Sequence, residues 1–149
     1  MSGRVFVMLF AAIAALFGGA LWYFQVYAYY DQIEGVTSLD VAGQEIAVED
    51  YRGIDAATSP NKLRACFRVD PRAFEGIPAA PEPEPLMPPA WFDCFDARSI
   101  SDDLAAGVAA AYLAADETPD GAEGYEILRM IAVYPDGRGY LWRHYRKAE

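Results

Sequence analysis

Residues 5–24 read VFVMLFAAIAALFGGALWYF, an unbroken run of apolar side chains close to the start of the chain. About 20 such residues, at the rise of an α-helix, span the hydrocarbon layer of a bilayer. The run leads into further aromatic residues up to Tyr30, and tryptophan and tyrosine are enriched where a bilayer meets water. This stretch predicts a transmembrane helix over residues 5–30, followed by one folded domain.

A cleaved signal peptide is the alternative to a retained helix. The apolar core of a signal peptide is usually about 7 to 15 residues long and ends at a site with small side chains. This run is longer and ends in bulky aromatics, and its small pair Ala12 and Ala14 lies in the middle. We therefore expect a single-pass anchor that stays in the lipid bilayer.

The flanking charges predict the orientation of the helix. Arg4 precedes the apolar run, and the next Lys or Arg is Arg52. Positively charged flanks stay in the cytoplasm. Residues 1–4 are therefore expected to be cytoplasmic, the helix to lie in the inner (plasma) membrane, and residues 31–149 to form a periplasmic domain.

This domain is strongly acidic. All 22 Asp and Glu residues fall in residues 31–149, together with 11 of the 12 Lys and Arg residues. Such a surface repels phosphate, so we expect no nucleic acid partner.

The two cysteines, Cys66 and Cys94, both lie in the part expected to be exported. An oxidising compartment would pair them, and the closed loop of about 29 residues would stabilise the fold by about 3 to 4 kcal/mol. A thiol-redox factor is the alternative, but the sequence lacks the Cys-x-x-Cys spacing of redox enzymes. A structural disulfide is the prediction.

Alternation of apolar and polar residues predicts an antiparallel β-sheet in the 119 residues of the exported part. The expected strands cover residues 36–41, 44–51, 63–69, 90–97, 125–134 and 139–145. Turns are expected at Ala42-Gly43 and at Pro135-Asp136-Gly137, and residues 55–62 are expected to be a loop.

One helix is expected outside the membrane. Ser99 or Ser101 can cap its first turn, and Pro119 follows its end. Its apolar stripe consists of Leu104, Val108, Tyr112 and Ala115. Together with the strands, this predicts an α+β domain in which an antiparallel sheet carries one packed helix.

Six of the twelve residues in segment 78–89 are proline. This composition excludes a helix and a central strand, and it favours an extended polyproline conformation. The segment is either an arm that docks a partner or a solvated loop whose prolines restrict the unfolded chain.

The residues needed for catalysis or metal binding are scarce. The one histidine, His144, lies beside Arg143 and near Arg146. Asp93, Cys94 and Asp96 lie close together in the sequence but lack nearby nitrogen ligands. We therefore expect no catalytic site, no metal and no cofactor.

Small residues recur at helical spacing within the apolar run. They are Ala11, Ala15 and Gly19, with Ala14 and Gly18 beside them. Such a face lets a second transmembrane helix approach closely, which predicts self-association or attachment to an integral membrane protein complex. The alternative is an alanine-rich sequence that scatters small residues at random.

Outside the membrane, Tyr140, Trp142 and His144 share one face of the last strand and are a candidate partner surface.

Several motifs carry a family resemblance. They are QVYAYYD at residues 25–31, RACF at 64–67, WFDCFDA at 91–97 and PDGRGY at 135–140. Together they resemble a family of small bacterial membrane proteins of unknown function found in purple non-sulfur bacteria and their relatives. The resemblance implies a single-pass, one-domain layout and no established activity.

The leading interpretation is a non-enzymatic, membrane-anchored periplasmic accessory or assembly subunit of a larger membrane complex, for example a respiratory or photosynthetic one. A periplasmic ligand-binding or sensing domain, with a pocket lined by Trp91 and Trp142, is the alternative. A thiol-redox factor that uses Cys66 and Cys94 is a third possibility.

Overall fold

The structure is a computed structural model that describes residues 2–148, and it divides into two compact units between Tyr30 and Asp31. Met1 and Glu149, the outer ends of the predicted segments 1–4 and 31–149, lie outside the described residues. The predicted α+β class is confirmed, because an apolar N-terminal helix precedes an antiparallel sheet with a short helix.

The first unit is helical over residues 3–28. Helix α1 (Gly3–Tyr23) continues into a π-helical turn (Phe24–Ala28). Together they form a helix of 26 residues that is long and apolar enough to cross a membrane. None of the residues of α1 is buried. The predicted apolar helix is therefore confirmed, whereas its retention as an anchor stays a prediction.

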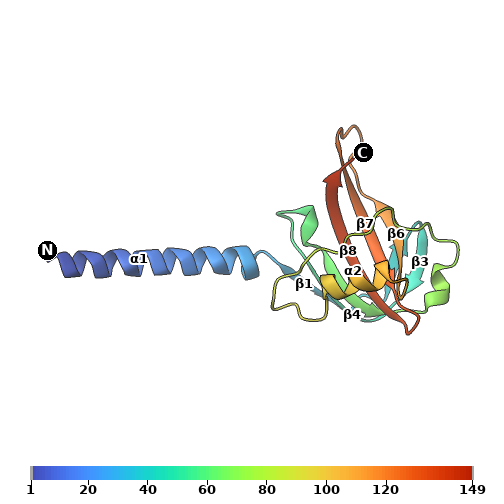
Figure 1. The fold of residues 1–149 in the computed structure, drawn as a ribbon, viewed down its shortest axis with the longest axis horizontal. Helices are drawn as coiled ribbons and strands as arrows, with labels where there is room; N and C mark the ends of the chain where they lie inside the picture. The colour runs from blue at the N-terminus through green and yellow to red at the C-terminus, as the bar shows by residue number, and fades with distance from the viewer. Residues whose placement is uncertain (1, 149) are drawn as a thin grey trace. The chain divides into compact units, whose positions relative to one another are not determined.

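The second unit contains a six-stranded antiparallel sheet in the order β1-β4-β5-β8-β7-β6 (Figure 1). Its strands are β1 (Asp31–Glu34), β4 (Glu49–Asp55), β5 (Arg64–Arg68), β6 (Ala110–Asp116), β7 (Tyr125–Val133) and β8 (Arg138–Lys147). A separate hairpin consists of β2 (Ser38–Val41) and β3 (Gln44–Ala47). The remaining elements are helix α2 (Ala97–Ala105) and the 3₁₀ turns Pro60–Lys62 and Pro71–Phe74.

The sheet has a buried core on one face. Because side chains alternate along a strand, Phe67, Ile131 and Leu141 share this face, and they cluster with Val41 and Ile46 from the β2–β3 hairpin. On the other face, Trp142 is fully buried and its ring lies 6.4 Å from the ring of Phe95, just before α2. The sheet is thus covered on both faces.

The β7–β8 hairpin follows the prediction. Val133 pairs with Gly139 across the turn at Pro135-Asp136-Gly137, and Gly137 has the positive φ of 90° that such turns require. β8 extends further than expected, to Lys147, whereas β7 ends at Val133, one residue earlier than expected. Gly139 also lies opposite Phe67, whose ring occupies the space where a side chain would begin.

The predicted helix, expected to begin at Ser99 or Ser101 and to end before Pro119, is wrong in its second half. α2 ends at Ala105 because Gly107 adopts a φ of 72°, with Val108 N donating to the carbonyl of Asp103 and Gly107 N to that of Leu104. Of the stripe residues beyond this point, Val108 lies in the bend after α2, and Tyr112 and Ala115 belong to β6, which pairs with β7.

The predicted strand over residues 90–97 is also wrong. These residues form turns, and α2 already begins at Ala97. Its cap is Asp96, whose side chain accepts hydrogen bonds from the backbone N–H groups of Arg98 and Ser99. The predicted caps Ser99 and Ser101 therefore lie three and five residues too far along the chain.

Residues 44–51 do not form one strand. The chain leaves the hairpin after Ala47 and enters the large sheet as β4, which extends to Asp55 in the segment expected to be a loop. Asp50 has a φ of 52° where the register with β5 shifts. Strand β1 was not predicted.

Segment 78–89 contains no helix and only one isolated bridge, Ala79 to Tyr112, as its composition led us to expect.

Candidate functional site

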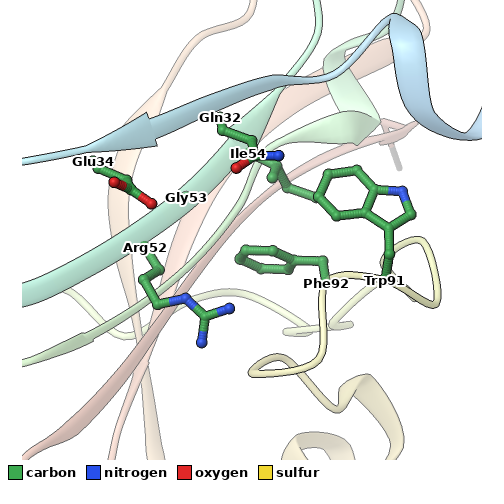
Figure 2. A pocket seen from close by; sticks show the side chains of 7 residues that line it. All are labelled: Gln32, Glu34, Arg52, Gly53, Ile54, Trp91 and Phe92. Carbon is green, nitrogen blue, oxygen red and sulfur yellow. The ribbon is translucent and has the colours of Figure 1, made fainter.

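A groove lies beside the edge strand β1, on the face of the sheet that also carries Trp142. Its volume is about 190 Å³. The lining residues are Gln32, Glu34, Arg52, Gly53, Ile54, Trp91 and Phe92. Figure 2 shows the two aromatic rings beside Ile54, with the polar side chains along the strands. The groove thus joins an apolar floor to a charged margin.

Three segments of the chain build this groove. β1 and β4 pair in register, with Gln32 opposite Ile54 and Glu34 opposite Arg52. The turn before α2 supplies Trp91 and the buried Phe92, whose rings meet edge to face at 6.3 Å. Sequence reasoning missed β1 and β4 as site elements, because nothing in their local pattern indicates which strand ends at a sheet edge.

An exposed ion pair lies at the margin of the groove. Arg52 Nη2 lies 3.2 Å from Asp93 Oδ1, and both side chains are more than half exposed. Exposed pairs of this kind contribute little to stability. Arg52 is therefore free to exchange this carboxylate for another anion or to remain as a positive neighbour of Glu34.

The disulfide is confirmed. Cys66, in the middle of β5, is bonded to Cys94, with their Cα atoms 6.3 Å apart. The bond joins the sheet to the turn that carries Phe92 and Phe95, so it also holds the aromatic side of the groove in place. This is a structural use of the two cysteines.

The candidate surface of Tyr140, Trp142 and His144 is not open. Their common face is confirmed by the strand register, but Trp142 is fully buried and His144 is only 8% exposed. Tyr140 is half-buried, with its ring 5.8 Å from that of Phe95. The prediction of an exposed partner surface is corrected for Trp142 and His144, because both side chains are buried; at Trp142 the turn before α2 packs Phe95 against the strand.

Arg64 lies on the same buried face and is only 3% exposed. It donates hydrogen bonds to the backbone carbonyls of Asn61, at 2.7 Å, and Leu86, at 2.6 Å, and its guanidinium lies 5.8 Å from the ring centre of Phe95. It thereby holds the proline-rich segment 78–89 against the sheet. A charged residue within an apolar strand was the signal that sequence reasoning overlooked.

The polar atoms of this buried face are incompletely paired. Within residues 2–148, neither Trp142 Nε1 nor His144 Nδ1 has a hydrogen-bond partner. Burial lowers the pKa of His144 below its ordinary value of 6.5; Arg146 and Arg64 lower it further, while Glu84 and Glu126 oppose the shift. The imidazole is therefore neutral at pH 7.

An ion-pair network lies on the opposite face of the sheet. Arg143 contacts Asp55 at 3.3 Å and Glu117, and Glu117 also pairs with Arg129 at 3.4 Å. All four side chains are half-buried. The network links β4, β7 and β8 to the chain just after β6, beside the outer strand β1.

The small residues of α1 are exposed. Nothing lies within 4 Å of a Cβ placed at Gly18 or Gly19, and Ala11, Ala14 and Ala15 are likewise exposed. Another helix can therefore approach this face without displacing any side chain of the described chain.

Residues 2–148 contain no group of three or more His, Cys, Asp or Glu side chains that could hold a metal ion. Asp93 is paired with Arg52, Cys94 is in the disulfide, and Asp96 caps α2. Each member of that sequence cluster thus has a structural partner.

These features define the class: a small α+β domain with a disulfide, joined to an N-terminal apolar helix. The helix indicates an anchor or a signal sequence, and the disulfide indicates an extracytoplasmic domain. The chain belongs to DUF6446, a family of unknown function, whose model matches residues 34–148. Neither the curated proteins nor the solved structures include a significant match to the chain.

Proposed function

We propose that this protein is a non-enzymatic, membrane-anchored accessory or assembly subunit of a larger membrane complex, respiratory or photosynthetic complexes being examples. The apolar helix would remain in the inner membrane with its N-terminus in the cytoplasm, and the disulfide-bonded domain would lie in the periplasm. The family motifs quoted above support placing the chain among the small single-pass proteins of purple non-sulfur bacteria and their relatives.

One observation carries this proposal: α1 exposes every residue from Gly3 to Tyr23, including the small face of Ala11, Ala15 and Gly19. In a bilayer, large apolar side chains pack well against lipid tails. A face of small residues instead lets a second helix approach closely, so that the two helices gain van der Waals contacts. The small face of α1 therefore favours packing against the transmembrane helix of a partner.

The geometry weighs against a ligand pocket lined by Trp91 and Trp142. The hollow beside Trp91 has a volume of about 190 Å³, smaller than the roughly 300 to 1,000 Å³ of typical small-molecule pockets. Trp142, the other expected pocket residue, is fully buried on its face of the sheet, beside Phe95. A pocket between the two tryptophans would require the turn that carries Phe95 to move away.

The proposal is tested by changing the volume of one helix face. Ala15→Leu should release the partner during purification in a gentle detergent. Ala20→Leu is the matched control, because it adds the same atoms about 140° away around the helix. Equal retention of the partner in both variants would contradict packing through the small face, and absence of any partner from the wild-type preparation would contradict the accessory role.

A further inference from the structure

The two edges of the sheet differ. The strand order ends at β6 on one side and at β1 on the other. The outer edge of β6 is covered, since Ala80 N donates to the carbonyl of Ala111 and Leu113 N to that of Pro78. β1 pairs with β4 alone among the strands of residues 2–148, so its outer edge has no partner strand.

The surface is hollowed on both sides of β1. Gln32 and Glu34 line the groove of Figure 2, together with Trp91 and Phe92. Asp31 and Ile33 line a second hollow on the opposite face; its other main residues are Asp55, Pro60, Ile127 and Arg143. Because successive side chains of a strand point to opposite faces, a strand added beside β1 would send alternate side chains into the two hollows.

We propose that an extended segment of a partner protein adds to the outer edge of β1, with Lys or Arg side chains facing Asp31 and Asp55 and apolar side chains against Trp91 and Phe92. Backbone hydrogen bonds supply the affinity in this binding mode, and the flanking hollows supply the sequence preference. The inference rests on the proposed accessory function and specifies the chemistry of its partner.

The charges around β1 favour a basic segment. Two of its four residues, Asp31 and Glu34, are acidic and none is basic. Asp31 lies directly opposite Asp55, and the carboxylate of Asp55 shares Arg143 with Glu117. Like charges directly opposite one another destabilise a strand pair, so a further cation beside Asp31 is favourable.

A second copy of this chain fits this edge less well. Antiparallel pairing of two β1 strands about a two-fold axis would place Asp31 of each copy opposite Glu34 of the other. Both of these contacts join like charges. The acidic edge therefore disfavours pairing between two copies of this chain and favours a segment of a different protein.

The test uses the full-length chain in nanodiscs of phosphatidylcholine, which carries no net charge. The probe is the labelled peptide Lys-Val-Lys-Val-Lys-Val-Lys, and the readouts are fluorescence anisotropy and amide hydrogen exchange. We expect saturable binding and slower exchange in residues 31–34. N-methylation of the central Lys and of an adjacent Val removes backbone donors but keeps the charge, and it should weaken binding by about tenfold or more.

Two matched double variants distinguish binding at the edge of β1 from general attraction between the basic peptide and the acidic domain. Asp31→Asn with Glu34→Gln should weaken binding about threefold to tenfold. Asp120→Asn with Glu123→Gln makes the same change of charge in the exposed loop after β6 and should leave binding unchanged.

The inference is overturned if the N-methylated peptide binds equally well, if exchange in residues 31–34 is unaffected, or if both double variants weaken binding equally. The helix test above distinguishes the two proposals. If Ala15→Leu releases a partner while the peptide fails to bind, only the strand inference is lost. If the wild-type chain purifies alone, the accessory role itself is lost.

Discussion

Removing the disulfide should weaken the domain without abolishing its fold. Cys66 and Cys94 are 28 residues apart, and the chain-entropy relation for a loop of this length gives about 3 to 4 kcal/mol at 25 °C. Both cysteines are half-buried, so Cys66→Ala with Cys94→Ala removes little packing. The remaining stability should keep the domain folded, because natural domains have about 5 to 15 kcal/mol.

Urea unfolding of the full-length chain in detergent micelles measures this loss. The midpoint temperature should also fall by about 10 to 20 °C for a domain of this size. Wild-type protein treated with a reductant is the control, and it should show the same loss as the double variant. A loss below about 1 kcal/mol would refute the loop-closure reasoning, and so would a reduced wild type that is as stable as the oxidised one.

Three further predictions concern single side chains. Gly139→Ala would place its Cβ against the ring of Phe67, so urea unfolding should show a loss of about 1 to 3 kcal/mol, and unchanged stability would contradict the packing described. His144 is held neutral with a lowered pKa, so the unfolded chain takes up the proton first and the free energy of unfolding should fall as the pH drops through 6.5; His144→Gln should flatten this dependence, and an equal slope would count against it. Tyr134→Phe removes the 2.6 Å hydrogen bond to Asp103 and should speed amide exchange in α2 more than in β8; uniform acceleration would argue against a local link.

Local patterns predicted the parts of this fold that depend on neighbouring residues. The apolar helix follows from composition alone, and the β7–β8 hairpin follows from alternation on both sides of Pro135-Asp136-Gly137. The error in residues 106–118 has a physical cause. The sequence AAYLAAD at residues 110–116 is compatible with both helical and strand periods, and pairing with β7 decides between them.

The candidate site depends on contacts that no local pattern contains. The edge position of β1 follows from the strand order of the whole sheet, and Trp91 lies beside β1 in a turn that the disulfide bonds to β5. Likewise, Trp142 and His144 were expected at the surface because alternation shows which residues share a face, but not which face another segment covers. Tertiary contacts therefore determined the site and corrected the expected partner surface.

The most direct test of the central claim is the composition of the particle that contains this protein in its own membranes. The tagged full-length chain would be extracted in a gentle detergent, and the mass of the particle and its subunits would be measured by native mass spectrometry. The account predicts a stoichiometric complex with a membrane protein, in which this chain keeps its N-terminal helix. A chain that is cleaved after the apolar segment, or that is recovered alone, would contradict it.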